Sequence, residues 1–153
     1  MTTVITYGTF DLFHIGHLNL LKRLKSLGDK LIVGISTDEF NAVKKKHSVI
    51  SFSDRYEIIR SIRFVDDVIQ ETCWDQKIPD IRRLGVDIFA MGDDWDGKFD
   101  FLKPFADVVY LPRTQGISST QIKGSLAGNF MFTSGPKKST GKLHYFGSAN
   151  SSA

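Results

Sequence analysis

Residues 4–36 read VITYGTFDLFHIGHLNLLKRLKSLGDKLIVGIS, and this stretch decides the fold. The apolar, β-rich segment VITY opens it, and Gly8 breaks that segment. From His17 onward leucines recur at helical spacing, and Gly28 is placed to end the helix. The nearly continuous apolar run LIVGIS at 31–36 is typical of a strand buried on both faces.

The alternation of strand and helix continues through the chain. Further strands are predicted at 67–70, 86–91 and 108–111, and further helices at 54–62, 75–84 and 118–126. Ser53 is the expected N-cap of the first of these helices, Gly85 closes the second, and the lysine-bearing segment 38–52 is interpreted as a loop. Five strands alternating with helices predict an α/β fold with a parallel sheet and right-handed crossovers. Such sheets bind ligands at the carboxyl ends of their strands.

The bulk properties are those of one ordinary globular domain. The 153 residues are 41% hydrophobic and 24% charged, and no apolar run approaches the ~20 residues that span a bilayer. The N-terminus lacks a secretory signal, and the single cysteine excludes an internal disulfide. The net charge of +3 favours anionic partners, but the only tight basic run, 44–46, is far shorter than a nucleic-acid-binding stripe. We expect a cytoplasmic protein that neither inserts into membranes nor binds nucleic acid.

The composition changes after residue 127. Residues 128–153 are rich in Gly, Ser, Lys and Asn and have no clear periodicity, although four aromatic residues leave a docking role open. We assign the folded domain to residues 1–127. Residues 128–153 are interpreted as a flexible tail, a linker or a non-native extension.

The strongest chemical signal is GTFDLFHIGH at 8–17, directly after the first predicted strand. His14 and His17 stand three residues apart at the start of a helix, where free N–H groups and a partial positive charge suit phosphate oxygens. Gly16 keeps a side chain from blocking that approach. One alternative is a metal site with Asp11 as third ligand, although the carboxylate base of the HExxH pattern is absent. The other is a histidine that caps the helix or packs in the core.

The second signal is RTQGISST at 113–120, which follows the last predicted strand and opens the last helix. An arginine and three hydroxyl groups within eight residues provide donors for several phosphate oxygens, the guanidinium through paired N–H groups. The alternative is an ordinary helix cap beside a surface arginine. The pairing of this segment with the first one favours a shared phosphate site.

These two segments carry a family resemblance. HIGH at 14–17 matches the HxGH motif of the nucleotidyltransferase superfamily, and 113–120 matches its RTxGISTT-like motif. Further matching segments are TYGTFD at 6–11, ISTDEFN at 35–41 and MGDDW at 91–95. From about residue 4 to residue 127 the chain resembles the cytidylyltransferase family, in particular members that use glycerol 3-phosphate. The resemblance implies a Rossmann-like three-layer nucleotidyltransferase fold with a five-stranded parallel sheet. It also implies transfer of CMP from CTP to glycerol 3-phosphate, which gives CDP-glycerol for teichoic acids or capsule-type polymers.

The resemblance also implies roles for individual residues. Those implied to bind the nucleotide are Gly8, Thr9, Phe10, Asp11, Gly16, Asp94, Thr114, Gly116, Ile117, Ser118, Ser119 and Thr120. Those implied in catalysis, where they stabilise charge as the α-phosphorus becomes five-coordinate, are His14, His17, Arg113 and Lys46. Those implied to bind or support the acceptor are Lys44, Arg55, Arg63, Asp66, Trp74 and Lys77. Without the resemblance, these acceptor residues are surface ion pairs, core aromatics or a solvated lysine loop.

Cofactor and partners follow from the same resemblance. Mg²⁺ is expected to arrive with CTP, because no carboxylate cage for it is visible, and a homodimer is implied. Two features depart from the family pattern: Gln115 replaces a common glutamate, and residues 128–153 have no counterpart.

The acceptor stays open among glycerol 3-phosphate, another polyol phosphate, phosphocholine and phosphoethanolamine. Trp74 and Trp95 are not expected to cluster with other aromatics, and Lys44 and Lys77 suit a plain phosphate monoester, so phosphocholine is disfavoured. Two further alternatives are an adenylyltransferase of the same superfamily and a nucleotide-binding module without activity.

Overall fold

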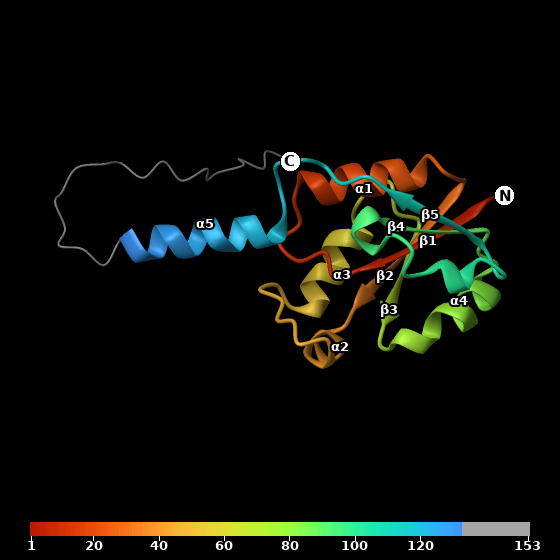
Figure 1. The fold of residues 1–153 in the computed structure, drawn as a ribbon, viewed down its shortest axis with the longest axis horizontal. Coiled ribbons are helices and arrows are strands. Elements are labelled where there is room, and N and C mark those ends of the chain that lie inside the picture. Colours follow the sequence, from red (N-terminus) through yellow and green to blue (C-terminus); the bar gives the residue numbers. More distant parts are fainter. Residues whose placement is uncertain (133–153) are drawn as a thin grey trace, which may run out of the picture.

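The computed structural model describes residues 1–132, and within that part five strands form one parallel sheet (Figure 1). The strands are β1 (Thr3–Gly8), β2 (Lys30–Ser36), β3 (Asp67–Glu71), β4 (Ile88–Gly92) and β5 (Asp107–Leu111). Their order across the sheet is β3-β2-β1-β4-β5, and every neighbouring pair is parallel. The predicted α/β fold with a five-stranded parallel sheet is confirmed.

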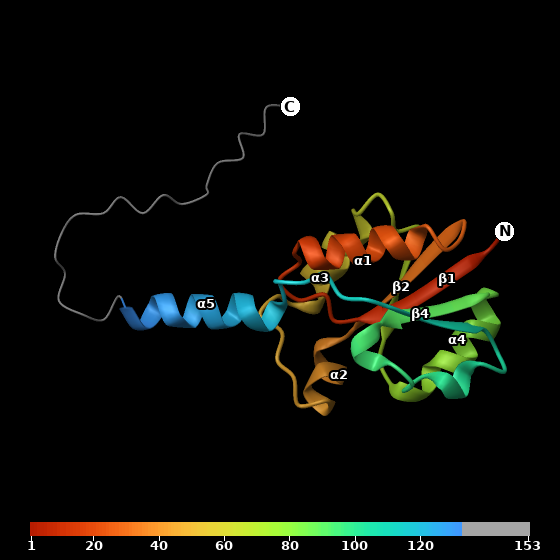
Figure 2. The same ribbon diagram turned by 45° about the horizontal axis from the view of Figure 1, so that its top comes forward.

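Helices cover both faces of the sheet and produce three layers (Figure 2). The α-helices of the described residues are α1 (Ile15–Lys25), α2 (Asp38–Val43), α3 (Phe52–Arg60), α4 (Lys77–Leu84) and α5 (Ser119–Phe132), of which α5 projects from the body. Helices α1 and α3 pack on one face through Leu21, Leu24 and Ile59, and α4 packs on the other through Ile81. The central strands supply apolar side chains to both cores, because alternate residues of a strand point to opposite faces.

The order of the strands reverses at β1. This strand pairs with β2 on one side and with β4 on the other, so the chain adds β2 and β3 on one side of it and then β4 and β5 on the other. In a parallel sheet such a reversal opens a crevice at the carboxyl ends of the strands. Both sequence motifs lie at that edge, since residues 9–17 follow β1 and residues 113–120 follow β5. The fold therefore brings together two segments that are about a hundred residues apart.

Two local predictions are wrong. Segment 38–52, predicted to be a loop, contains α2, because the Thr37 hydroxyl accepts a hydrogen bond from the Phe40 N–H at 3.1 Å and caps a helix there. Helix α1 ends at Lys25, before the glycine expected to terminate it. Gly28 serves close packing instead, since a Cβ at this position would lie 2.7 Å from the carbonyl oxygen of residue 2.

The remaining differences concern helix ends. Ser51, rather than Ser53, caps α3, and α4 begins at Lys77 after a short 3-10 turn over Trp74–Gln76. Gly85 ends α4 as predicted, with the positive φ of 61° that a left-handed C-cap needs. Helix α5 runs to Phe132, beyond its predicted end at 126 and into the segment 128–153. The rest of that segment lies outside the described residues, and its interpretation stays a prediction.

Candidate active site

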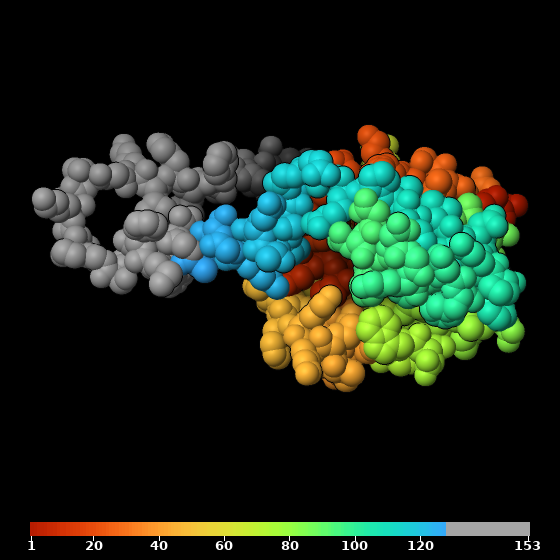
Figure 3. Space-filling model, viewed as in Figure 1, coloured from red at the N-terminus to blue at the C-terminus, as the bar shows by residue number. Residues whose placement is uncertain are grey.

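A cavity of about 550 Å³ lies at the carboxyl ends of the central strands. In Figure 3 it is the hollow whose floor is formed by the loop after β1, between the start of α5 and the segment that follows α2. The predicted site residues that line it are Gly8, Thr9, Phe10, Asp11, His17, Lys44, Lys46, Trp74, Asp94, Ser119 and Thr120. Both sequence motifs and the lysine segment thus face one cavity.

A second cavity of about 180 Å³ adjoins the first, with His17, Asp94 and Ser119 lining both. The further predicted residues that line it are His14, Gly16, Arg113, Thr114, Ile117 and Ser118. The Arg113 guanidinium donates to the Asp94 carboxylate at 3.2 Å, and both side chains are about half exposed. The histidine pair and the arginine therefore meet in one continuous site.

The two histidines form the first turn of α1 and are held by it. His14 is the N-cap, and its Nδ1 accepts from the Gly16 N–H at 3.0 Å, while Nδ1 of His17 accepts from the His14 N–H at 3.2 Å. His14 therefore caps the helix, which was one of the alternatives considered from the sequence, and it also lines the candidate site. Because each Nδ1 is an acceptor, each neutral ring carries its proton on Nε2 and can donate it to a ligand.

Electrostatics keep both imidazoles neutral in the free protein. Burial, followed by the neighbouring His14, lowers the pKa of His17 to about 4, against a small opposing effect of Asp11. Burial, followed by the charge of Arg113, lowers the pKa of His14 as well. The rings stack with centroids 3.9 Å apart, so a charge on one disfavours a charge on the other.

The loop that carries this pair is conformationally unusual. Phe10 and Leu12 have positive φ angles of 53° and 48°, which side chains other than glycine seldom adopt. The Phe10 ring is buried and packs edge-on against His17 at 5.4 Å. A Cβ on Gly16 would lie 2.8 Å from the His14 ring, so this glycine leaves room for the histidine side chain.

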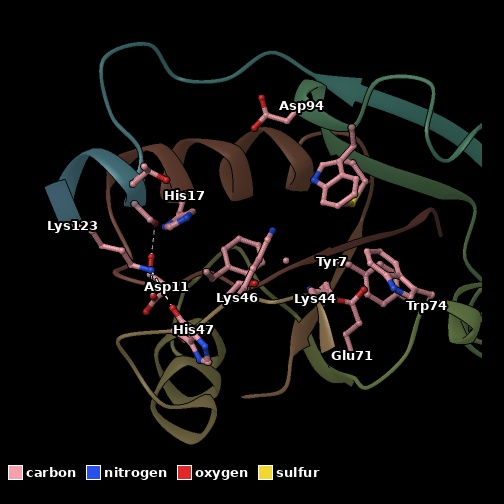
Figure 4. A pocket seen from close by; sticks show the side chains of 18 of the residues that line it. Tyr7, Asp11, His17, Lys44, Lys46, His47, Glu71, Trp74, Asp94 and Lys123 are labelled. Atoms are coloured by element: carbon pink, nitrogen blue, oxygen red, sulfur yellow. Dashed lines mark hydrogen bonds and ion pairs between the residues drawn. The ribbon is translucent and has the colours of Figure 1, made fainter. Parts of the chain in front are cut away.

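Asp11 fastens this loop to two other segments. Its carboxylate accepts from the backbone N–H groups of Val49 and Ile50 at 2.8 and 2.9 Å and pairs with Lys123 of α5 at 3.1 Å (Figure 4). Burial alone would raise the pKa of this carboxyl, but the hydrogen bonds from Ile50, Val49 and Lys123 lower it. The backbone oxygen of Asp11 also accepts from the Ser119 hydroxyl at 2.7 Å. Its contribution to the site is to hold the loops together.

At the opposite end of the cavity two lysines surround one carboxylate; Lys44 and Glu71 line the cavity, and Lys77 does not. Lys77 Nζ lies 2.8 Å from one oxygen of Glu71, and Lys44 Nζ lies 3.9 Å from the other. Burial lowers the pKa of Lys44, although Glu71 opposes that effect. Trp74 and Trp95 lie at this end with ring centroids 6.3 Å apart, and Trp95 also contacts Phe99. The prediction that these two tryptophans stand apart from other aromatics is therefore wrong, since residues distant in sequence bring the rings together.

Five predicted residues lie outside both cavities, and one of them, Lys77, is the buried partner of Glu71 described above. Arg55 is completely buried and donates to the carbonyl oxygens of Thr9 and Ser36 at 2.8 Å, so it joins the loops behind the cavity. Arg63 is exposed, and Asp66 binds Lys25 beside the amino end of β3, at the far edge of the sheet. Gly116 takes a positive φ of 82° in the turn before α5. Within a single chain, Arg63 and Asp66 therefore lie away from the candidate site.

Other cavity residues were not predicted as site residues. They are Tyr7, His47, Ser48, Glu71, Met91, Trp95, Phe99 and Lys123. For Glu71 a signal existed, because a carboxylate that ends a buried strand of a parallel sheet points to the ligand edge. The signal for Lys123 was its position one helical turn after Ser119, which places the two side chains on the same face of the helix.

The metal alternative for the histidine pair is not supported. Both Nδ1 atoms and the Asp11 carboxylate already accept hydrogen bonds from the chain. Within residues 1–132 there is no group of three His, Cys, Asp or Glu side chains arranged to hold a metal ion.

Comparison with known proteins agrees with this geometry. A family model described as cytidylyltransferase-like matches residues 5–125. The chain is 59% identical over 127 residues to a glycerol-3-phosphate cytidylyltransferase of Bacillus spizizenii, which covers 83% of this chain and 98% of that protein. It is 53% identical over 128 residues to the Staphylococcus aureus protein of the same name, covering 84% and 97%. A solved structure titled a lipopolysaccharide core biosynthesis protein from Thermoplasma volcanium has a TM-score of 0.66 at 26% identity, over 75% of this chain and 99% of that one.

Proposed function

The chain belongs to the cytidylyltransferase-like family, and on that premise we propose that it transfers CMP from CTP to glycerol 3-phosphate. An oxygen of the glycerol 3-phosphate phosphate group attacks the α-phosphorus of CTP and forms a new P–O bond. The bond from that phosphorus to the bridging oxygen of the β-phosphate breaks, and the electron pair leaves with pyrophosphate. The product is CDP-glycerol. Because the attacking oxygen is already anionic, positioning and charge neutralisation matter more than a strong base.

The histidine end of the site suits the triphosphate. Neutral His14 and His17 donate Nε2–H to phosphate oxygens, whose bonds strengthen as negative charge grows on the α-phosphate. Arg113 exchanges its Asp94 partner for a phosphate oxygen, and Lys46 approaches from the other side of the cavity. The start of α5, at Ser119 and Thr120, adds hydroxyl donors next to them.

The lysine end suits the acceptor. Lys44 faces the cavity with a side chain that is 12% exposed, so its ammonium is only partly hydrated and well placed for a phosphate dianion. Lys77 and Trp74 stand beside it. The acceptor phosphate then lies between Lys44 and the histidine pair, which is the position an attack on the α-phosphorus requires.

Mg²⁺ is part of the proposal as a companion of CTP. When bound, it neutralises charge on the triphosphate and on the leaving pyrophosphate. The donor set fits an ion held mainly by phosphate oxygens and water, since the described part of the chain has no three-ligand cluster of its own. Lys46 and Arg113 neutralise part of the remaining charge, and the neutral His14 and His17 donate hydrogen bonds to the phosphate oxygens.

Assembly, location and pathway rest on the resemblance alone. We propose a homodimer, which light scattering would report as twice the 17.2 kDa of the chain, a cytoplasmic location, and CDP-glycerol supply to teichoic-acid or capsule-type polymers. None of the helices within residues 1–132 combines the length and apolar character that a membrane crossing needs.

The observation that carries the proposed function is the single site formed by both phosphate-binding segments, in a chain 59% identical to a named enzyme of this activity. The test is release of pyrophosphate from CTP and Mg²⁺ with a panel of glycerol 3-phosphate, ribitol 5-phosphate, phosphocholine and phosphoethanolamine. We expect glycerol 3-phosphate to be used at least tenfold better than the others. Faster use of another acceptor would overturn the substrate, and use of ATP in preference to CTP would overturn the nucleotide.

A further inference from the structure

We infer that the buried pair of Glu71 and Lys77 sets the choice of acceptor. The ammonium group of Lys77 occupies the place among aromatic rings where a cationic head group of a substrate would otherwise bind. This inference rests on the proposed function. It assigns Glu71 as a specificity-determining residue that recognises a hydroxyl group of the acceptor. It assigns Lys77 as the residue that excludes phosphocholine and phosphoethanolamine.

Glu71 lines the end of the main cavity, and Lys77 is buried beside it. Glu71 is the last residue of β3, and its side chain is only 5% exposed, while that of Lys77, the first residue of α4, is 2% exposed. Their charged atoms are 2.8 Å apart. A buried ion pair adds little stability over apolar residues of similar size, because both charges lose their hydration. Its position at a ligand cavity therefore points to recognition.

Aromatic rings surround the Lys77 ammonium. Its Nζ lies 4.7 Å from the ring centroid of Tyr7, 5.2 Å from that of Trp74 and 5.7 Å from that of Phe99. Ring faces at these distances attract a cation, and together with the Glu71 carboxylate they form the kind of cage that binds substrate ammonium groups. In this chain the cage is already filled by its own lysine.

Lys77 also separates two cavities. Trp74, Trp95 and Phe99 line both the main cavity and an outer cavity of about 490 Å³, and Lys77 lines only the outer one. Removal of its side chain would extend the main cavity toward the outer one. The cage would then combine three rings, a carboxylate that has lost its closest partner and space for an ammonium.

The same geometry suits an acceptor with hydroxyl groups. Oε2 of Glu71 is occupied by Lys77, but the nearest cation to Oε1, Lys44 Nζ, is 3.9 Å away and beyond hydrogen-bond length. Oε1 therefore keeps the capacity to accept a hydrogen bond from an alcohol. An acceptor with a hydroxyl beside its phosphate satisfies both Lys44 and Glu71, whereas a cationic head group meets the Lys77 charge.

The test compares Lys77→Ala with the unmodified chain on glycerol 3-phosphate and phosphoethanolamine. We expect the ratio of kcat/KM for phosphoethanolamine to that for glycerol 3-phosphate to rise at least about tenfold, because the substrate ammonium occupies the vacated cage. Ethylammonium chloride should restore part of the glycerol 3-phosphate activity of Lys77→Ala, by at least about threefold, by replacing the lost group. An unchanged ratio in a folded variant would overturn the inference.

The matched control is the double variant Glu71→Gln, Lys77→Ala, which keeps the added space but lacks the carboxylate. We expect it neither to gain phosphoethanolamine turnover nor to respond to ethylammonium. An equal response of both variants would show that space alone is responsible and would contradict the role of Glu71.

A measurement on the unmodified chain covers the case in which Lys77→Ala does not fold. Phosphocholine and phosphoethanolamine should inhibit glycerol 3-phosphate turnover only with inhibition constants at least about tenfold above its KM. Equal competition by either would overturn the inference. If the unmodified chain does not use glycerol 3-phosphate at all, the proposed function fails, which is a separate outcome from normal turnover without the selectivity change.

Discussion

The two ends of the candidate site, which we propose bind the triphosphate and the acceptor, are built in different ways. At the triphosphate end, His14 and His17 are neighbours in sequence, uncharged, and oriented by backbone N–H groups of their own helix turn. At the acceptor end, charged side chains from separate elements converge, with Lys44 after α2, Glu71 at the end of β3 and Lys77 at the start of α4. The first end depends on local backbone geometry, and the second depends on the whole sheet being assembled.

This difference fits the two tasks. A triphosphate that brings its own cation needs hydrogen-bond donors whose effect grows during the reaction, and neutral imidazoles provide them without strong ground-state attraction. An acceptor must be selected among similar phosphate monoesters, and fixed charges in a low-dielectric pocket discriminate better than exposed ones. Changes at the triphosphate end should therefore act mainly on kcat, and changes at the acceptor end mainly on substrate choice.

The largest effect is expected for His17→Ala. It removes an Nε2–H donor from the α-phosphate while leaving the acceptor end intact, so kcat should fall by at least about a hundredfold with a small change in the KM for glycerol 3-phosphate. Steady-state pyrophosphate release measures both parameters. A loss expressed only in the acceptor KM would contradict the division between the two ends.

The next effect concerns stability. Arg55 donates to the carbonyl oxygens of Thr9, Ser36 and Ile50 and to the Asp38 carboxylate, all at 2.8 to 2.9 Å. Arg55→Met leaves the buried carbonyl groups without donors, so the free energy of unfolding should fall by about 3 kcal/mol. Urea denaturation measures it.

The control for Arg55→Met is Arg60→Ala on the same helix, α3. Arg60 is exposed and pairs only with Glu57 at 3.4 Å, so its removal should cost less than about 0.5 kcal/mol. A stable Arg55→Met variant with a raised acceptor KM would restore the predicted substrate-binding role of Arg55.

A smaller effect is expected from pH. The pKa of His17 is about 4 in the folded chain, whereas a free imidazole titrates near ~6.5. Between these values the unfolded chain binds a proton that the folded chain excludes, so this stabilisation is present above about pH 6.5 and is lost as the pH falls toward about 4. We expect a loss of roughly 2 kcal/mol, below the full value for that shift because the ring is not fully enclosed.

Urea denaturation across this pH range, with His17→Gln as the control, isolates the contribution of this ring. The control lacks the titrating group, so its stability should fall less. Parallel curves for the two proteins would mean that His17 does not titrate as described.

The smallest effect is expected for Lys123→Ala. Lys123 joins α5 to the Asp11 carboxylate at 3.1 Å and to the His47 carbonyl oxygen at 3.3 Å, but its side chain is 40% exposed. We expect the KM for CTP to rise two- to fivefold, with less than about 1 kcal/mol lost in stability. Lys103→Ala, which removes a surface pair with Asp100, is the control and should leave turnover unchanged.

The comparison of the two ends also explains what the sequence predicted. The strands themselves and the triphosphate end follow from hydrophobic runs and from motifs that are contiguous in the chain, so His14, His17 and the segment 113–120 were predicted at their observed edge. The order of the strands across the sheet was not predicted. Helix α2 was missed because its capping threonine follows a strand directly and its six residues are too few for a visible period.

The acceptor end was predicted less well for a physical reason. The Glu71–Lys77 pair and the Trp74–Trp95 contact depend on how β3, α4 and the turn after β4 pack, which no local pattern encodes. Arg55 illustrates the opposite error. A charged residue assigned to substrate by resemblance proved to be fully buried against backbone carbonyls.

Helix α5 has one more consequence. It stands away from the body in Figures 1 and 2, and its first turns are joined to the Asp11 loop through Ser119 and Lys123. Fourteen helical residues extend about 20 Å, so a tilt of ~10° at the base displaces the far end by roughly 3 to 4 Å. A small change of the Asp11 loop is therefore amplified at the outer end of α5, and a pair of spin labels, one on the outer half of α5 and one on the sheet domain, would measure it as a change in distance.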